Sequence, residues 1–378
     1  MKSRERVLAS LNYQSTDKWP VDFGSTNVTS IHLIAYENLL KHLGIRQGKT
    51  EFLHYGQQIV KPCEELLQLF QVDTRPVALK RSLGSNSKFI NDNEFIDDFG
   101  LIYKRPEGGL YFDTSNAPLK HAQTIGEILE YPWPDPSTLV NCDGVSEEAK
   151  ALRENTDYAI VGTAGGATVY MSAQNMRSYE QLFIDMVSDT GLFEALLDRI
   201  LEIRLWQMNK LLDCAGEYLD IIQIAEDITG QLGPLFAPEL YRSLIKPRTK
   251  AIVDTIKSRY SHIKVLYHVC GSIAGFIEDF IEIGIDALTP VQVSAANMDT
   301  KMLQDMFGGR ISFWGGINQQ EILARGSPQD VVDEVKKRTA DFGYNGGYVP
   351  FATHNIQADV CPENIIAMFD TINSFKFT

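Results

Sequence analysis

From residue 157 onward, short apolar runs rich in β-branched residues alternate with longer segments whose apolar residues recur at helical spacing. Strands that alternate with helices form a parallel sheet joined by right-handed crossovers, which restricts the chain to α/β folds. The strand-like runs are YAIVGT (158–163), YLDIIQIAED (218–227), IKVLYHVC (263–270), IDALTPV (285–291), ISFWGGI (311–317) and GGYVPFAT (346–353).

The number of strand candidates favours a closed barrel over an open sheet. WPVDFG (19–24) reads as a further strand ending in a glycine turn, which brings the set to at least seven over 378 residues. An open dinucleotide-binding sheet should carry a GxGxxG loop, and the nearest sequence, GTAGGAT (162–168), lacks it. We therefore predict one (β/α)8 TIM barrel domain spanning residues 1–378.

The N-terminal part of the chain lacks this regular alternation. Residues 2–14 have an amphipathic pattern that predicts a helical extension, and residues 31–43 predict a second helix ending at a glycine. Residues 85–121 are polar, with short aromatic-rich runs between turn residues, which predicts a β-hairpin insertion. The proline-rich stretch 131–138 predicts an extended connector.

Charge and cysteine content exclude several classes of partner. The net charge of −14, without a basic stripe, argues against nucleic acid as a partner. No run approaches about 18 apolar residues, and the first residues lack the apolar core of a signal peptide, so we expect a cytoplasmic protein without a membrane partner. The five cysteines form an odd set without CxxC spacing, which predicts free thiols in a reducing compartment.

Several good zinc ligands lie where predicted strands end. His268 and Cys270 are two residues apart and project from the same face of one strand end. His354 ends a later strand, and a barrel brings the carboxyl ends of its strands to a common mouth. Imidazole and thiolate are zinc ligands, so the three residues form a candidate metal site. The alternatives are a core histidine at 268, a small buried thiol at 270 and a loop histidine at 354 that bonds the backbone.

Three acidic residues at strand ends are candidates for catalytic roles. Glu226 and Asp227 end the 218–227 run, and Asp22 ends the 19–24 run. A carboxyl group at the mouth of a barrel can act as a general acid or base. Glu226 and Asp227 have an alternative interpretation, in which they cap the following loop and its helix.

Three further residues are candidates for substrate binding. Gln292 follows a strand and either orients a polar substrate or satisfies a buried carbonyl. Gly316 permits a ligand to approach the backbone, or simply permits close packing. Tyr348 belongs to the aromatic segment YVPF, which could line an apolar pocket at the mouth.

Longer motifs resemble the uroporphyrinogen decarboxylase superfamily. They occur in order over most of the chain, beginning with RERVLASLNYQSTDKWPVDFG at the N-terminus. The later ones are GQLGPLFAPELYRSLIKPRTKAIVDTIK (230–257), HVCGSIAGFIEDFIEIGIDALTPVQ (268–292), FWGGIN (313–318) and HNIQADVCPENIIAMFDTI (354–372). The resemblance implies a (β/α)8 barrel with its active site at the carboxyl ends of the strands.

The resemblance also separates two chemistries. True uroporphyrinogen decarboxylases carry an arginine-rich loop resembling RQAGRY after the first strand, whereas the corresponding segment 22–36 has no arginine. The other branch comprises zinc-dependent methyltransferases, whose motif is H-x-C followed by a late cysteine. His268 and Cys270 match the first part, and the late ligand falls at His354, an imidazole instead of a thiolate. Cys361, beside a proline, is the less favoured ligand.

The resemblance therefore implies a corrinoid-linked methyltransferase. Zinc would act as the Lewis acid, and a methyl group would move between an aryl methyl ether or a thiol and methylcobalamin carried by a corrinoid-binding partner protein. One alternative is a metal-free, decarboxylase-like lyase on a smaller carboxylated substrate, with Asp22 or Asp227 as the acid-base group. Another is a barrel without catalysis that binds a small ligand or a corrinoid-protein partner.

Overall fold

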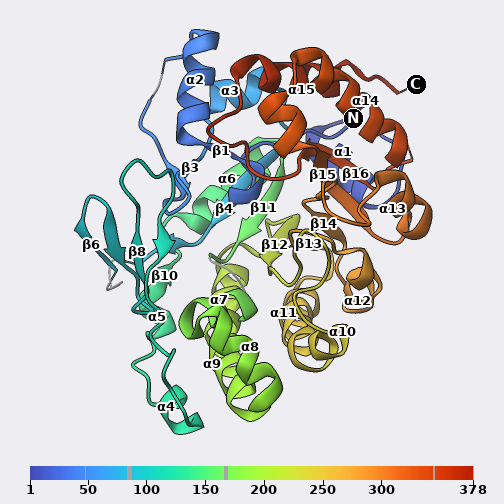
Figure 1. The fold of residues 1–378 in the computed structure, drawn as a ribbon. Helices are drawn as coiled ribbons and strands as arrows, with labels where there is room; N and C mark the ends of the chain where they lie inside the picture. The colour runs from blue at the N-terminus through green and yellow to red at the C-terminus, as the bar shows by residue number, and fades with distance from the viewer. Residues whose placement is uncertain (47, 83–86, 166–168, 344, 378) are drawn as a thin grey trace.

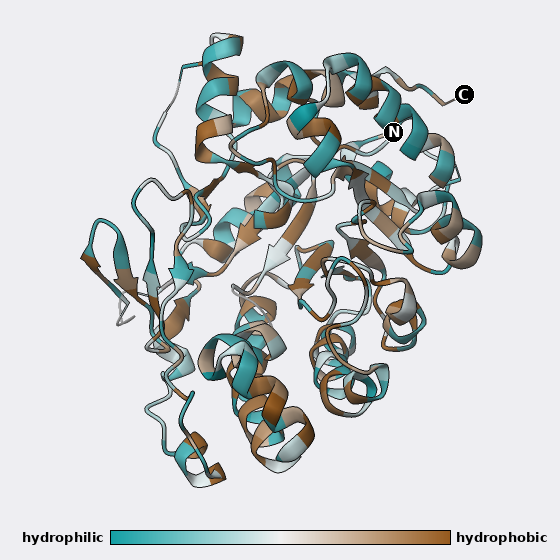
Figure 2. Ribbon diagram, in the orientation of Figure 1, coloured by the Kyte–Doolittle hydropathy of each residue, from teal (hydrophilic) through white to brown (hydrophobic). Residues whose placement is uncertain are grey.

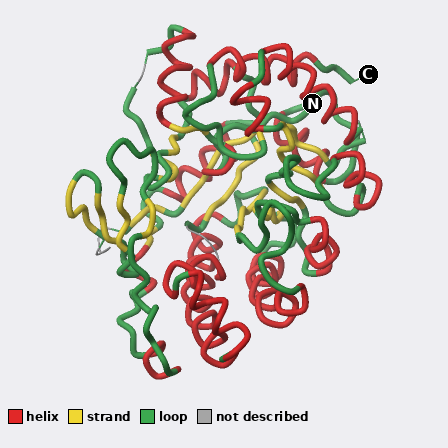
Figure 3. The backbone as a smooth tube through the Cα atoms, viewed as in Figure 1, coloured by secondary structure: helices red, strands yellow, loops and turns green. Residues whose placement is uncertain are grey.

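The computed structural model describes residues 1–46, 48–82, 87–165, 169–343 and 345–377. Its centre is a curled parallel sheet surrounded by helices, which confirms the (β/α)8 barrel class (Figures 1 and 3). The strands, in the order β16-β15-β14-β13-β12-β11-β4, form a sheet of seven. They are β4 (Thr74–Ala78), β11 (Ala159–Thr163), β12 (Ile221–Ala225), β13 (Lys264–His268), β14 (Ala287–Thr289), β15 (Ser312–Ile317) and β16 (Tyr348–Ala352).

The prediction of a strand at 19–24 is wrong, because this segment forms no backbone ladder. The N–H of Val21 donates to the Asp73 side chain at 2.9 Å, so it is not available to a neighbouring strand. The segment still fills the gap between the two end strands of the sheet. Asp22 accepts a hydrogen bond from Thr74 in β4, and the ring of Trp19 lies 5.5 Å from that of Tyr348 in β16.

The predicted N-terminal helix is present as α1 (Ser3–Leu11) and closes the amino end of the barrel. Its Val7 and Leu11 are buried in one cluster with residues of the barrel strands. The strand members of this cluster are Ala159, Val161, Ile221, Leu266, Ala287, Trp314 and Val349. The backbone N–H of Gly347, just before β16, donates to the carbonyl of Ser10 at 2.6 Å. This end of the barrel is therefore a packed core.

The remaining helices lie outside the sheet, and the hydropathy colouring shows hydrophobic central strands with hydrophilic stretches on the outer helices (Figure 2). None of the described helices is long and apolar enough to cross a membrane. The helices are α2 (Leu33–Leu43), α3 (Glu64–Leu69), α4 (Ile125–Leu129), α5 (Pro136–Leu139), α6 (Val145–Asn155), α7 (Val169–Arg177), α8 (Tyr179–Ser188), α9 (Thr190–Ala215), α10 (Pro238–Leu240), α11 (Lys246–Arg259), α12 (Ile277–Glu282), α13 (Thr300–Phe307), α14 (Pro328–Phe342) and α15 (Pro362–Ser374).

The insertion predicted as a β-hairpin at 85–121 is a larger unit. Its described part forms a four-stranded antiparallel sheet at one side of the barrel, and residues 85 and 86 lie outside the described residues (Figure 1). The four strands are β6 (Lys88–Asn91), β7 (Glu94–Ile96), β8 (Ile102–Lys104) and β9 (Asp113–Thr114). Small additional pairings join β1 (Ile31–His32), β3 (Ile59–Val60) and β2 (Phe52–His54), and join β5 (Lys80–Arg81) to β10 (Val140–Asn141).

The prediction that all five thiols are free is wrong for one pair. Cys142 and Cys214 form a disulfide between residues 72 positions apart, with their Cα atoms 6.0 Å from one another. The chain brings the segment before α6 against the end of α9, a proximity that cysteine spacing does not reveal. Cys63, Cys270 and Cys361 are free.

Candidate functional site

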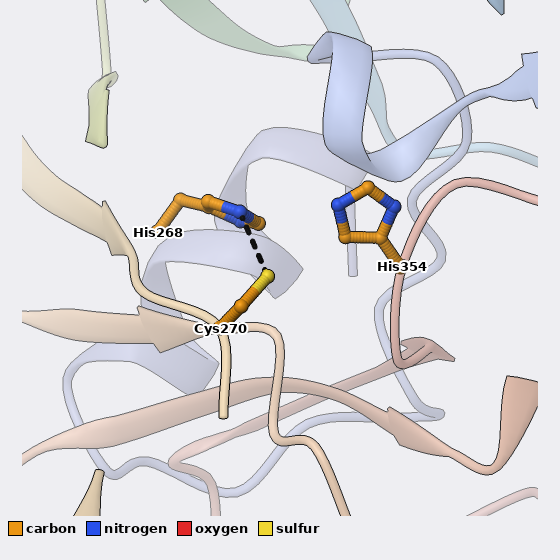
Figure 4. A group of neighbouring side chains, drawn as sticks. All are labelled: His268, Cys270 and His354. Atoms are coloured by element: carbon orange, nitrogen blue, oxygen red, sulfur yellow. Dashed lines mark hydrogen bonds between the residues drawn. The ribbon is translucent and has the colours of Figure 1, made fainter. Parts of the chain in front are cut away.

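The three predicted metal ligands lie together at the carboxyl end of the barrel (Figure 4). His268 is the last residue of β13, Cys270 follows it, and His354 lies two residues after β16. One ligand atom from each residue lies within 4.8 Å of the others. The Nε2 of His268 is 3.4 Å from the Sγ of Cys270, and the two imidazole rings are 5.4 Å apart between centroids. Curling of the sheet thus joins the ends of strands that are not neighbours within it.

Hydrogen bonding fixes the orientation of the His354 imidazole. Its Nδ1 lies 2.9 Å from the side-chain oxygen of Asn355, and the Asn355 amide nitrogen donates to the carbonyl of Asn27. This amide orientation makes Nδ1 the donor and leaves the lone pair on Nε2 available. By contrast, the Nδ1 of His268 is buried without a hydrogen-bond partner among the described residues.

The protonation states in the cluster follow from its burial. Burial lowers the pKa of His268 well below its usual value, and the adjacent His354 lowers it further. Burial also lowers the pKa of His354, so both imidazoles are neutral at pH 7 and can act as ligands. Burial and the nearby carboxylate of Asp227 raise the pKa of the Cys270 thiol. Two neutral imidazoles and one thiol within contact range fit the three-ligand pattern of a catalytic zinc site.

The adjacent acids Glu226 and Asp227 lie in different surroundings. The Oδ1 of Asp227 accepts from the backbone N–H of Cys270 at 3.3 Å, and Asp227 lines the cavity beside the cluster. Burial raises the pKa of Asp227. Glu226 is fully buried and accepts from the first backbone N–H groups of α7, which are those of Val169, Tyr170 and Met171 at 2.7, 3.0 and 3.0 Å. Glu226 therefore caps a helix and is not among the described residues that line the cavity.

Asp22 is also enclosed away from the cavity. Its carboxylate accepts from the Thr74 hydroxyl at 2.5 Å and from the Trp314 indole N–H at 3.0 Å. The side chain is fully buried, and this burial raises its pKa. These contacts tie the 19–24 segment to the sheet, and the structure does not bring Asp22 to the cluster of His268, Cys270 and His354.

The three residues predicted to bind substrate lie outside the cavity lining. Gln292 accepts from the backbone N–H of Gly271 at 2.7 Å and so supports the turn after Cys270. Tyr348 is fully buried, stacks on Phe342 and donates to the carbonyl of Gly315 at 2.8 Å. Gly316 is packed near the Tyr348 hydroxyl.

Gly271 itself must be glycine for this turn to form. Its φ is +88°, and a Cβ there would lie 2.6 Å from the carbonyl oxygen of Gly230. The tight turn sets the direction in which the chain leaves Cys270.

A cavity of about 240 Å³ lies against the cluster and is lined by His268, His354 and Asp227. It continues into an outer cleft of about 880 Å³, with which it shares His354 and Arg204. The segment Ser25–Val28 forms part of the inner wall, beside the apolar side chains of Met171 and Ile224. A small molecule in the inner cavity would contact the cluster, and the outer cleft would leave it open to a larger partner.

Arg204 is a cavity residue that sequence reasoning missed. It lies in α9 and is the only arginine or lysine among the described residues that line either space. Burial lowers its pKa to about 10, so it remains a cation at neutral pH. A sequence signal existed, because Ile200, Arg204 and Met208 follow one another at intervals of four on a helix whose residues 200 and 208 are buried.

Comparison with known proteins identifies the family. The uroporphyrinogen decarboxylase (URO-D) family matches residues 110–375, and the chain belongs to that family. A uroporphyrinogen decarboxylase from Pseudoalteromonas atlantica is 21% identical over 277 residues, which is 71% of this chain and 74% of that protein. A second, from Alkalilimnicola ehrlichii, is 22% identical over 264 residues, 67% of each chain.

The fold is shared with a solved methyltransferase. The structure of a methyltransferase from Methanosarcina mazei superposes with a TM-score of 0.65 and 18% identity, and the match covers 99% of both chains. The likeness extends over the N-terminal extension and the insertion as well as the barrel.

Proposed function

We propose that this protein is a corrinoid-linked methyltransferase that uses zinc held by His268, Cys270 and His354. The methyl group moves between a small aryl methyl ether or thiol and the cobalamin of a partner protein. The observation that carries the proposal is the convergence of the three ligand atoms within 4.8 Å, beside a cavity that His268 and His354 line. The full-length likeness to a methyltransferase fold supports it.

The chemistry divides between the metal and the chain. Held by His268, Cys270 and His354, zinc would supply Lewis acidity to the heteroatom that carries or receives the methyl group. Asp227 lies beside Cys270 on the cavity wall, where its carboxyl group can accept or return the proton of that heteroatom. The apolar side chains of Met171 and Ile224 exclude water from the reacting end. The outer cleft leaves room for a corrinoid to approach.

The main alternative is a decarboxylase-like lyase, which the family itself suggests. A tetrapyrrole with eight carboxylates needs several cationic partners. Among the described residues lining the two spaces, Arg204 is the only arginine or lysine. A single cation fits a substrate with one carboxylate. The alternative function is therefore a lyase that acts on a smaller acid.

Metal analysis with an activity readout tests the proposal. Protein purified without chelators should contain one zinc per chain, and His268→Ala, Cys270→Ala and His354→Ala should each lose it. Cys361→Ser is the matched control, because this exposed cysteine lies outside the cluster and should retain zinc. Wild-type protein with cob(I)alamin and a methyl ether should form methylcobalamin. Metal-free protein that decarboxylates a carboxylic acid would overturn the proposal in favour of the lyase.

A further inference from the structure

Arg204 is a half-buried cation that forms no ion pair with any described carboxylate, although Glu226 and Asp97 attract it from a greater distance. Its Nη1 donates to the side-chain oxygen of Gln207 at 2.8 Å and its Nη2 to the Ser172 hydroxyl at 2.9 Å. Its Nε is buried and has no hydrogen-bond partner among the described residues. No carboxylate of the described chain lies within ion-pair distance of it, whereas most other arginines are paired. A guanidinium has five N–H donors, so most of its capacity is unused.

This arrangement of Arg204 is energetically unfavourable. A desolvated charge is costly unless a paired group compensates it, and neutral oxygens from Gln207 and Ser172 compensate it only in part. The ring of Phe99 lies 5.4 Å from the guanidinium carbon and adds a weaker cation–π attraction. A ligand that brings a negative group into the cavity would supply the missing partner.

We propose that Arg204 binds the carboxylate of a small monoanionic substrate whose methyl-bearing or methyl-accepting heteroatom lies at the His268–Cys270–His354 cluster. Arg204 and the two histidines line the same cavity, so one molecule can contact both. The inference rests on the proposed function only for the nature of the reacting end.

Charge and size narrow the substrate class. The inner cavity pairs one arginine with one aspartate, Asp227, so a dianion would be poorly neutralised there. A carboxylate matches the planar fork of a guanidinium and can be bound through two parallel hydrogen bonds. The volume of about 240 Å³ is just below the range of roughly 300–1,000 Å³ for sites of drug-sized ligands. A one-ring or shorter acid fits these limits.

Binding measurements test this assignment without turnover. Calorimetry would compare 4-methoxybenzoate with neutral 4-methoxybenzamide, 4-methoxybenzenesulfonate and dianionic 4-methoxyphenyl phosphate. We expect the carboxylate to bind roughly 10- to 100-fold more tightly than the amide, the scale of one charged hydrogen bond. Arg204→Gln should abolish this preference and Arg204→Lys should reduce it. Arg325→Gln, at an exposed arginine outside the cavity, should leave it unchanged.

Thermal unfolding of the same variants separates binding from a structural role. Because Arg204 forms no ion pair with a described carboxylate, ligand-free Arg204→Gln should unfold within a few degrees of wild type. Equal affinity for acid and amide in the wild-type protein, or a preference that survives in Arg204→Gln, overturns the assignment, as does tightest binding of the phosphate. Should Arg204→Gln not fold, the ligand series on wild type and Arg204→Lys decides the question.

The test of carboxylate binding by Arg204 can succeed or fail independently of the methyltransferase proposal. Binding would be measured with and without added zinc and without cobalamin. Zinc and methyl transfer without a carboxylate preference refute the role of Arg204 alone. A carboxylate preference in a protein that neither holds zinc nor forms methylcobalamin refutes the proposed function alone.

Discussion

The two ends of the barrel differ in how their charged side chains are paired. At the amino ends of the strands, Asp73, Asp220 and Asp286 directly precede β4, β12 and β14. Each accepts a backbone N–H and also pairs with a cation. The N–H donors are those of Val21, Ile160 and Val265, and the cations are Arg6, Arg153 and Lys257.

At the carboxyl ends, some of the polar groups beside the cavity lack such partners. Arg204 has no carboxylate within ion-pair distance among the described residues, and the Nδ1 of His268 has no hydrogen bond there. Burial raises the pKa of Asp227, which forms no ion pair with a described lysine or arginine. The amino end therefore contributes to stability, and the carboxyl end retains groups that a metal and a ligand can satisfy.

The largest effect should come from breaking a pair at the amino end. Arg6→Met removes the cation that contacts Asp73 at 2.6 Å, where both side chains are almost fully buried. A buried carboxylate left unpaired should lower the free energy of unfolding by about 3–5 kcal/mol. Urea unfolding at pH 7 measures this loss.

The control for that variant is an exposed pair at the same end. Lys2→Ala removes the partner of Asp157, and both side chains are more than half exposed. It should change the free energy of unfolding by less than about 1 kcal/mol. A loss of similar size in the two variants would contradict the view that burial gives the Arg6 pair its importance.

The metal cluster should contribute to stability only when zinc is present. With free zinc at about 100 times its dissociation constant, binding should raise the free energy of unfolding of wild type by about 2.7 kcal/mol. Cys270→Ser should lose this increment while its zinc-free stability changes little, because the thiol makes few other bonds. Cys361→Ser should behave as wild type. An increment that persists in Cys270→Ser would place the metal elsewhere.

The sequence revealed most of the barrel because its strands are buried on both faces and read as continuous apolar runs. The strand β4 was not predicted, because its sequence TRPVA contains a proline and two polar residues. Segment 19–24 reads as a strand but contributes no ladder, since Asp73 takes the N–H of Val21. Side-chain competition for backbone donors is not visible in an apolar pattern.

Only part of the candidate site could be predicted from the sequence. His268, Cys270 and His354 could be grouped because each follows a strand, and strand ends meet in a barrel. Glu226 and Asp227 were grouped too, although adjacent residues of an extended chain point in opposite directions. Arg204 belongs to a helix, where a buried stripe does not show which of its residues faces a cavity.

Substitution of Gln292 should have a smaller effect, and it tests whether this residue supports the turn after Cys270 or binds substrate. Gln292→Ala removes the acceptor for the N–H of Gly271, which should lower the free energy of unfolding by about 1–3 kcal/mol. Because the turn carries Cys270, zinc affinity should also fall, by roughly tenfold or more. Titration with zinc and urea unfolding measure the two changes. Gln320→Ala, at an exposed glutamine, should alter neither, and unchanged zinc affinity in Gln292→Ala would argue against a supporting role.

The smallest effect should be a pH dependence at the amino end. Asp17 bonds to Arg6 at 2.7 Å, and this contact, with the terminal amine, holds the pKa of Asp17 well below its usual range. A depressed folded-state pKa gives stability that is present above the unfolded value of about 3.9 and lost as pH falls through the folded value. Since Asp17 is 41% exposed, Asp17→Asn should cost about 1 kcal/mol or less at pH 7. Urea unfolding measures the difference in free energy of unfolding between this variant and wild type, which should begin to shrink below about pH 4. A difference that stays constant into strong acid would mean that the pairing of Asp17 does not stabilise the amino end.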